Sequence, residues 1–257
     1  MCPLCLKKEF RFIKSISAHN LAQIYSKELN FNTYNYIDQN LDLLECAVCS
    51  LQTWFPIISS PSELYSHLQN FSWYYQEHKW EYDICKKLVD KDKTILEVGC
   101  GTGSFRLHIK SGSYTGLEFN PTLQDPEIHN QTVESHSLER AAYYDCAFSF
   151  QVLEHTTCAL TFLQGLGHSV KCGGTIAISV PFNSSYLQYA DGFALNLPPH
   201  HLTRWHIPSL LYAAKILNCN LESLHFNKFN SLDYETRFVN DPETHIGNSV
   251  LAIYRKL

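Results

Sequence analysis

Short hydrophobic runs alternate with longer amphipathic stretches along the chain from residue 91 onward. The runs are rich in β-branched and aromatic residues and end at glycine, proline or polar clusters, which is typical of strands. Seven such runs lie at 94–100, 114–119, 131–136, 144–150, 173–181, 221–227 and 249–256. Helical patterns at 153–171 and 207–218 separate several of them. This alternation predicts an α/β domain with an open, mostly parallel sheet. No helical pattern separates the last two runs, so we expect them to form an antiparallel edge hairpin.

The chain before residue 91 has a different pattern. Residues 61–90 are dense in aromatic residues with few helix breakers, and Ser62 is a suitable N-cap, so we expect a helix there. Residues 1–60 begin and end with a C-x-x-C pair around a middle rich in Asn and Tyr. We therefore expect three parts: a small module at 1–60, a helical linker at 61–90 that covers a ligand site, and the α/β domain at 91–257.

Composition narrows the class of protein. The chain has 257 residues, 45% of them hydrophobic and 18% charged, which indicates a globular protein. Its net charge of −5 offers no general attraction to nucleic acid or to an anionic membrane. No apolar run approaches the roughly 20 residues of a membrane helix, and the N-terminus lacks a signal-peptide hydrophobic region. We expect a soluble cytoplasmic protein with reduced cysteines.

The stretch "ILEVGCGTGSF" is the most informative one in the chain. A predicted strand ends in Gly99, Gly101 and Gly103, where glycine allows a tight turn and close approach of a ligand to the backbone. A dinucleotide fingerprint would need a glycine at position 104, which is serine, and the G-K-[ST] of a P-loop is absent. Glu97 under the loop suits a ligand with an ammonium group. Glu118 ends the next strand and suits two ribose hydroxyls.

Four motifs in order resemble the class I S-adenosylmethionine-dependent methyltransferases. They are "LEVGCGTG", "GLEFN", "YDCAFSFQVLEH" and "KCGGTIAISVP". The resemblance implies a Rossmann-like, mostly parallel seven-stranded sheet with helices on both faces. It implies that Glu97 and the loop hold the methionine part of the cofactor, that Glu118 holds the ribose, that Ser137 and Leu138 face the adenine, and that Gln151 lies near the sulfonium. The implied cofactor-binding residues are Glu97, Gly99, Cys100, Gly101, Gly103, Glu118, Phe119, Ser137, Leu138, Gln151 and Val152.

The two C-x-x-C pairs indicate a metal site. Cys2, Cys5, Cys46 and Cys49 could give four thiolates to a structural zinc ion, although the 40-residue spacer exceeds the usual length. We expect the other six cysteines to be small buried residues. Together with "CAVCSLQTWFP", "WYYQEHKWEY" and "NLPPHHLTRW", the pairs resemble a subgroup of bacterial class I methyltransferases with an N-terminal zinc-ribbon-like domain. Members of this subgroup are often encoded near polysaccharide genes. The chain departs from the subgroup at Leu6 and Ser50, where glycine usually follows each pair.

Histidines are concentrated in "NLPPHHLTRWH", after the fifth strand of the resembled fold. A second metal site would need the histidines to converge. Because adjacent His200 and His201 point different ways in an extended or helical chain, we do not favour a second metal site here. A histidine suits removal of a hydroxyl proton, and the candidates are His201, then His200 and His155. Alternatively, these histidines and Arg204 fix a lid through hydrogen bonds.

The sequence also supports expectations for His206 and for the aromatic segment "WYYQEHKWEY". His206 precedes a helical pattern and is expected to be structural. In "WYYQEHKWEY", we expect Trp80 to pack between the two domains, and either Tyr74 or Tyr75 to contact the cofactor or acceptor.

These observations favour a methyltransferase that acts on a hydroxyl, less readily on an amine or carbon, of a small-molecule or sugar-containing acceptor. One alternative is an RNA or protein methyltransferase whose ribbon grips its substrate, but residues 1–60 carry five basic and five acidic residues, which cancel. A second alternative is a cofactor-binding, inactive partner subunit. The sequence does not decide the oligomeric state.

Overall fold

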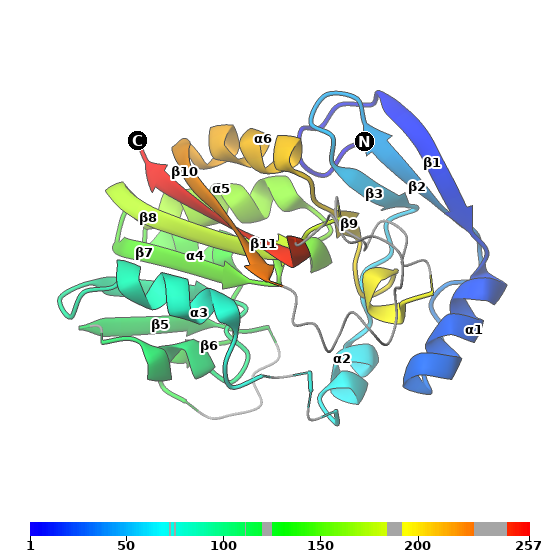
Figure 1. Cartoon of the computed structure of the whole chain (residues 1–257), viewed down its shortest axis with the longest axis horizontal. Coiled ribbons are helices and arrows are strands. Elements are labelled where there is room, and N and C mark those ends of the chain that lie inside the picture. Colours follow the sequence, from blue (N-terminus) through cyan, green and yellow to red (C-terminus); the bar gives the residue numbers. More distant parts are fainter. Residues whose placement is uncertain (72, 75, 111, 120–124, 184–191, 229–245) are drawn as a thin grey trace.

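Two β-sheets form the framework of the molecule (Figure 1). The computed structural model describes residues 1–71, 73–74, 76–110, 112–119, 125–183, 192–228 and 246–257. Within these residues the larger sheet has seven strands and the smaller sheet has four. The larger sheet follows the order β10-β11-β8-β7-β4-β5-β6, and the smaller one the order β1-β2-β3-β9.

The larger sheet is the expected one. Its strands are β4 (Thr94–Val98), β5 (Ser113–Leu117), β6 (Ile128–His129), β7 (Tyr144–Phe150), β8 (Val170–Pro181), β10 (Cys219–Lys228) and β11 (Ile246–Lys256). The pairs among β4, β5, β6, β7 and β8 are parallel. β11 runs antiparallel to both β8 and β10, which confirms the antiparallel edge hairpin. The carboxyl ends of the parallel strands therefore meet at one edge, where open α/β sheets bind ligands.

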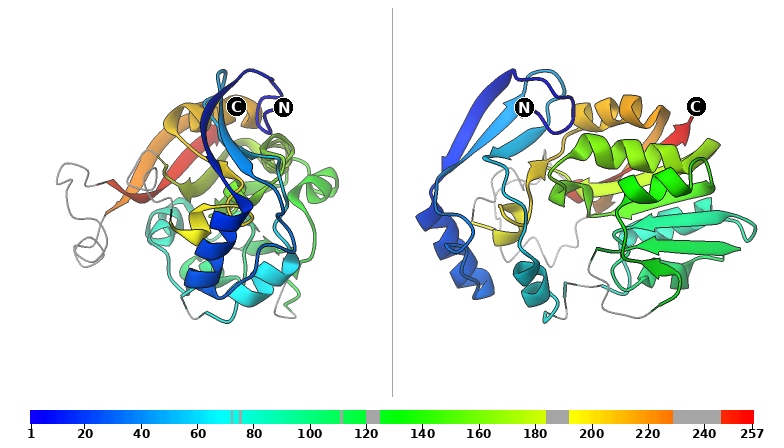
Figure 2. Two further views of the ribbon diagram at one scale, coloured as in Figure 1. Left: turned by 90° about the vertical axis from the view of Figure 1, so that its right-hand side faces the viewer. Right: turned by 180° about the vertical axis from the view of Figure 1, so that it is seen from behind.

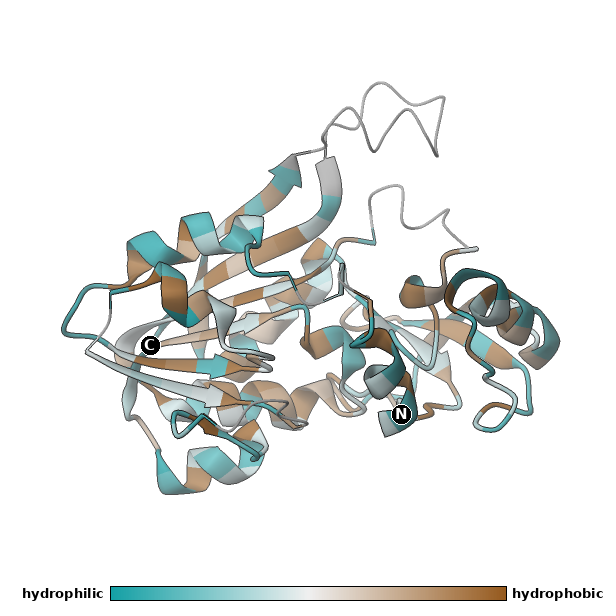
Figure 3. Ribbon diagram, turned by 90° about the horizontal axis from the view of Figure 1, so that it is seen from below, coloured by the Kyte–Doolittle hydropathy of each residue, from teal (hydrophilic) through white to brown (hydrophobic). Residues whose placement is uncertain are grey.

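Helices cover both faces of this sheet (Figure 2). On one face lie α4 (Val133–Glu139), α5 (Ala159–Ser169) and α6 (Ile207–Leu217), over a buried aliphatic core. On the other lie α3 (Trp80–Cys85) and the short 3-10 helices η1 (Lys86–Leu88) and η2 (Ser104–His108). The core of this second face is aromatic, with Tyr82, Phe105, Phe148 and Phe150 in contact. Figure 3 shows the strands mostly brown or white and the helices mixed with teal.

The smaller sheet combines segments from both ends of the chain. β1 (Phe10–Ile16), β2 (Leu41–Cys46) and β3 (Gln52–Phe55) come from the N-terminal module, with α1 (Ala18–Leu29) between the first two. The fourth strand, β9 (Thr203–Arg204), belongs to the histidine-rich segment and pairs antiparallel with β3. Trp205 then forms a bridge to Phe182 after β8. The histidine-rich segment therefore joins the two sheets.

The structure corrects two expected elements. The stretch 131–136 is not a strand: the third strand is β6, and α4 begins at Val133. Residues 61–90 are not one helix but α2 (Ser62–Leu68), α3 and η1. Ser62 is the first helical residue of α2 rather than its cap, because Pro61 occupies the N-cap position without a side-chain hydrogen bond.

Other expectations have mixed outcomes. The helical patterns at 153–171 and 207–218 correspond to α5 and α6, and the stretch before α5 is the 3-10 helix η3 (Leu153–His155). Of the six scattered cysteines, Cys158 is half-buried and Cys172 is exposed, so burial holds only for the other four. Among the described residues, no helix combines the length and apolar character that crossing a membrane requires.

Candidate functional site

The glycine loop follows β4 and is tied to the end of β5. Gly99, Gly101 and Gly103 all have φ in the left-handed region, at 72°, 56° and 73°. The N–H groups of Gly99 and Cys100 donate to the carbonyl of Leu117, at 2.7 and 3.1 Å. A Cβ on Gly99 would lie 2.3 Å from a methyl of Val152, so glycine is required here for both conformation and space.

Glu97 lies buried beneath this loop. Its carboxylate accepts a hydrogen bond from the Tyr114 hydroxyl. Burial raises the pKa of Glu97 to about 7, although the Tyr114 hydrogen bond and the charge of Lys79 act in the opposite direction. Because burial outweighs the effect of the neighbouring positive charges, this carboxylate is suited to bind a cationic group of a ligand.

Glu118 directly follows β5 and reaches across to the loop. Its Oε2 accepts the Gly101 N–H at 2.8 Å, which joins the two strand ends. The next residue, Phe119, is 77% exposed, and its carbonyl accepts a hydrogen bond from the Asn130 side chain. A hollow of about 430 Å³ lies beside the end of the loop. It is lined by Glu77, Thr102, Gly103, Ser104, Arg106 and Leu107.

Gln151 directly follows β7 in an unusual conformation. Its φ of 60° is in the left-handed region, which costs a non-glycine residue about 1 kcal/mol or more. Its side-chain amide donates to Glu81 Oε1 and to Ser179 Oγ, both at 3.2 Å. Glu81, on α3, is itself buried, and no motif in the sequence singles it out. The turn at Gln151 presents Val152 and η3 toward the glycine loop.

The residues expected to face the adenine lie on α4 instead of after a strand. Ser137 is buried and its hydroxyl donates to the carbonyl of Glu134, whereas Leu138 is 79% exposed. Their selection rested on a third strand at 131–136, which is wrong. Asn130 and Gln131 occupy the positions that directly follow β6.

Three histidines converge beside η3. One nitrogen from each of His155, His200 and His201 lies within 4.8 Å of the others. The rings of His200 and His201 are stacked, with centroids 4.6 Å apart and planes 24° apart. The sequence argument that these two neighbours diverge is therefore wrong. His200 and His201 are buried and His155 is half-buried, and burial, as the largest cause, lowers each pKa: that of His155 to about 4, and those of the other two well below the usual value.

Glu154 lies next to these rings and was not singled out from the sequence. Its Oε1 is 3.7 Å from Nε2 of His155 and 3.8 Å from Nε2 of His201. Burial raises the pKa of its carboxyl to about 8. Its backbone carbonyl accepts the N–H of Leu202 at 2.9 Å, which fixes the histidine-rich segment to η3.

The aromatic segment before β4 and the residues around the histidines carried the remaining expectations. Tyr74 contacts His200 through its hydroxyl, 3.1 Å from Nε2, while Tyr75 lies outside the described residues. Trp80 is half-buried, packs against the aromatic core of the larger sheet and donates to Ser249 Oγ. Arg204 is buried, donates to the carbonyl of Asn196 and stacks on Trp54. His206 is the N-cap residue of α6, as expected.

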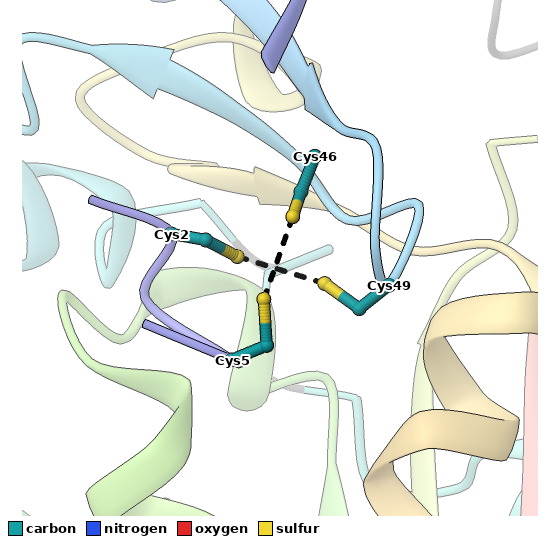
Figure 4. A group of neighbouring side chains, drawn as sticks. All are labelled: Cys2, Cys5, Cys46 and Cys49. Atoms are coloured by element: carbon teal, nitrogen blue, oxygen red, sulfur yellow. Dashed lines mark hydrogen bonds between the residues drawn. The ribbon is translucent and has the colours of Figure 1, made fainter. Parts of the chain in front are cut away.

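The four N-terminal cysteines form a compact cluster that could hold a metal ion (Figure 4). Sγ of Cys2 is 3.6 Å from Sγ of Cys49, and Sγ of Cys5 is 3.4 Å from Sγ of Cys46. A zinc ion bound by four thiolates at about 2.3 Å separates the sulfurs by roughly 3.8 Å. The distances and the absence of disulfides among these free cysteines fit such an ion.

The two turns that carry the cysteines share one backbone pattern. The N–H groups of Leu6 and Ser50 donate to the carbonyls of Cys2 and Cys46, at 3.0 and 2.9 Å. Leu6 and Ser50 have φ of 60° and 58°, so the positions that glycine usually occupies keep a glycine-like conformation here. The cluster packs into the same core as the larger sheet, and the carbonyl of Pro3 accepts the Leu160 N–H of α5.

A family model described as a methyltransferase domain matches residues 72–225, more than half of the chain. The chain belongs to this methyltransferase family. The match of this methyltransferase domain spans β4 to β8 and the histidine-rich segment, so the glycine loop, Glu118, Gln151 and the three histidines all lie inside it.

Curated relatives and solved structures agree with the family. The methyltransferase is 31% identical over 102 residues to the ubiquinone biosynthesis O-methyltransferase of Nitrosomonas europaea, covering 34% of this chain and 43% of the relative. It is 30% identical to the enzyme of that name from Serratia proteamaculans, with 34% and 42% covered. The chain thus spans less than half the length of the curated relatives it matches.

The solved structures support the class I methyltransferase fold. An S-adenosylmethionine-dependent methyltransferase from Archaeoglobus fulgidus superposes with a TM-score of 0.55 at 14% identity, covering 68% of this chain and 91% of the other. The YcgJ protein of Bacillus subtilis gives a TM-score of 0.54 at 9% identity, covering 70% and 99%.

Proposed function

We propose that the protein transfers a methyl group from S-adenosylmethionine to a hydroxyl of a small-molecule acceptor. The observation that carries the proposal is the meeting of the glycine loop, Glu118 and Gln151 at the carboxyl ends of adjacent parallel strands, with neutral histidines beside them. The names of the relatives, which are O-methyltransferases, support a hydroxyl acceptor.

The residues at the strand ends fit the cofactor. Gly99, Gly101 and Gly103 hold the loop in a left-handed backbone conformation, and among the described residues Glu97 forms no salt bridge that would compete with a cationic group of the cofactor. We assign the methionine part to Glu97 and the loop, and the ribose to Glu118. Cys100, Phe119 and Val152 flank these groups. The cofactor supplies the activated methyl group on its sulfonium, which Gln151 would face.

The adenine assignment is changed by the fold. Because Ser137 and Leu138 lie on α4, we propose Asn130 and Gln131, directly after β6, as the residues nearest the adenine. Phe119 offers an exposed ring at the neighbouring strand end.

The protein's own part in the reaction is alignment and proton removal. His201 remains our candidate base, with His200 and His155 as alternatives. The low pKa of His201 keeps the imidazole neutral at physiological pH, and the Glu154 carboxyl 3.8 Å away would stabilise the imidazolium once it is ionised. As attack breaks the S–CH₃ bond and forms the O–CH₃ bond, the hydroxyl proton passes to the imidazole nitrogen.

We further propose that the N-terminal cysteines bind zinc as a structural ion. Four thiolates satisfy its coordination, so no position is left for substrate. We retain the division into 1–60, 61–90 and 91–257 as functional parts, with a sugar-containing molecule as one acceptor class. The balanced charge of residues 1–60 argues against a nucleic-acid substrate.

The experiment that tests the function uses methyl-labelled S-adenosylmethionine, the purified protein and a fractionated lysate of the native host. Label in a small-molecule or carbohydrate fraction is the expected result. Label in RNA or protein would replace the proposed acceptor by a macromolecule. Cofactor binding without label in any fraction would favour an inactive partner subunit.

A further inference from the structure

The histidine cluster has the features of a metal site in addition to those of a base. His155 follows the strand β7, whereas His200 and His201 come from the segment before β9, about 45 residues later. Three imidazoles from two distant segments present nitrogens within 4.8 Å of one another, with His200 and His201 buried and His155 half-buried. Packing alone rarely gathers three neutral histidines around one point.

Hydrogen bonds fix which nitrogens face the shared space. Nδ1 of His155 lies 2.7 Å from the carbonyl of His200, and Nδ1 of His200 lies 3.0 Å from the carbonyl of Leu195. Since a carbonyl accepts and cannot donate, each Nδ1 carries the proton. Each Nε2 therefore presents a lone pair, which is the form that ligates a metal. A backbone carbonyl on the second nitrogen is the usual support of a metal-ligating histidine.

Several polar atoms of this cluster are buried without a hydrogen-bond partner. Among the described residues, neither carboxylate oxygen of Glu154 has a hydrogen-bond partner, and Nδ1 of His201 has none. A buried carboxylate without a partner costs several kcal/mol unless it is protonated or neutralised by a cation. Glu154 is fully buried, and its Oε1 lies between the Nε2 atoms of His155 and His201.

We propose that His155, His200 and His201 bind one divalent first-row transition metal ion, zinc foremost, with Glu154 as the carboxylate that balances its charge. Imidazole donors select such ions over Mg²⁺ and Ca²⁺, which prefer oxygen. Three protein ligands leave a fourth position open, as in catalytic zinc sites. The Tyr74 hydroxyl, which now donates to Nε2 of His200, has to turn aside.

The role of this ion rests on the proposed methyl transfer. The acceptor hydroxyl would take the open position, where the ion lowers the pKa of the hydroxyl. Its proton passes to Glu154 as the oxygen attacks the methyl carbon and the sulfonium leaves as a neutral thioether. In this form the histidines act as ligands, and Glu154 rather than His201 accepts the proton.

Metal stoichiometry of the full-length protein tests the site. Wild-type protein stripped with a chelator is titrated with Co²⁺ against a competing chelator, while thiolate charge-transfer bands and ligand-field bands are followed. We expect two equivalents: one with thiolate bands from the cysteine cluster, and one without them. His155→Gln and His200→Gln should each reduce the total to one equivalent and keep the thiolate bands. The matched control, His168→Gln at an exposed position of α5, should bind two.

A wild-type total of one equivalent, with full thiolate character, would overturn the metal site even if the histidine variants do not fold. So would two equivalents in folded His155→Gln and His200→Gln proteins, checked by circular dichroism. The readout does not depend on turnover. Methyl transfer without a second metal would overturn this inference alone, whereas a bound second metal without methyl transfer would overturn the proposed function alone.

Discussion

Glu118 combines two roles in the proposed cofactor site, since it holds the Gly101 N–H and would also hold the ribose. We expect Glu118→Ala to raise the dissociation constant of S-adenosylmethionine by about 10–100-fold, because each hydrogen bond to a charged group contributes about 1.5–3 kcal/mol. Isothermal titration calorimetry measures the change, with Glu63→Ala, an exposed glutamate of α2, as control. Unchanged affinity in the Glu118 variant would refute the ribose assignment.

The raised pKa of Glu97 predicts that the affinity for the cofactor depends on pH. Its pKa of about 7 exceeds the ordinary 4.5, so in the free protein the carboxyl is partly protonated at neutral pH. The groups that face it are Tyr114, Lys79, Glu118 and Arg106. A cofactor ammonium favours the ionised form, so binding should release protons near pH 7 and tighten as pH rises to about 7, then level off.

Calorimetry in two buffers of different ionisation enthalpy measures this proton release. Glu97→Gln keeps an acceptor for Tyr114 and should remove the buffer dependence. Equal heats in both buffers for the wild-type protein would mean that Glu97 does not sense the cofactor's charge.

The sequence located the candidate residues at the strand ends better than it did the histidine geometry. Motifs place Gly99, Glu118 and Gln151 because strand ends are encoded locally. The convergence of His200 and His201 depends on a turn in which both of their N–H groups donate to the carbonyl of Leu197, at 3.1 and 3.0 Å. Neither a regular helix nor an extended chain makes this turn, so arguments from regular geometry could not anticipate it.

At the scale of elements, the junction of the glycine loop with Val152 is the most sensitive contact. Gly99→Ala should abolish measurable cofactor binding and destabilise the fold by about 2–4 kcal/mol, through a clash and a positive φ. Gly173→Ala is the matched control, because Gly173 also has positive φ, at 75°, but open space around it. Thermal unfolding measures the stability of both variants, and calorimetry measures their cofactor binding. The double variant Gly99→Ala/Val152→Ala should recover part of the stability and binding that Gly99→Ala loses.

The two cysteine turns carry residues that glycine would suit better. Leu6 is exposed and has φ of 60°, so Leu6→Gly should raise the stability of the metal-loaded protein by about 0.5–1 kcal/mol. Leu6→Ala keeps a Cβ and should bring no gain. Chemical denaturation measures the difference, and an equal effect of both substitutions would show that the backbone conformation is not the cause.

The strands of the larger sheet and the helices around it could be predicted from the hydrophobic periodicity of the sequence, except where that pattern was ambiguous. In and directly after 131–136, the buried positions Val133, His136 and Ser137 have helical spacing, and the Thr132 hydroxyl caps the Ser135 N–H. That capping signal could have revealed the helix. β6, by contrast, has two residues and is too short to show alternation. The segment between α2 and α3 contains no helix breaker that would predict the break. Phe71 and Tyr74 lie in this segment and pack against the N-terminal core, and we attribute the break to this packing.

At the scale of the whole molecule, the cysteine cluster is part of the main core. Removing its metal should therefore lower the melting temperature of the entire chain, by about 10 °C or more, in a single transition. Differential scanning calorimetry with and without a chelator measures this. Cys46→Ser should lose the cysteine-bound ion and show a smaller chelator-dependent shift than the wild type, whereas Cys172→Ser, at an exposed position, should behave as wild type. Two separate transitions would contradict a shared core.

β9 limits how the protein can be divided or recombined. A chimera that exchanges residues 1–60 for another module would leave Thr203 and Arg204 without the strand they pair with, two positions from His201. A designer who wants a new N-terminal module would have to transplant β3 and the segment 196–206 together. The same pairing makes the two halves candidates for a split reporter, in which reassembly of separately expressed fragments restores the histidine cluster.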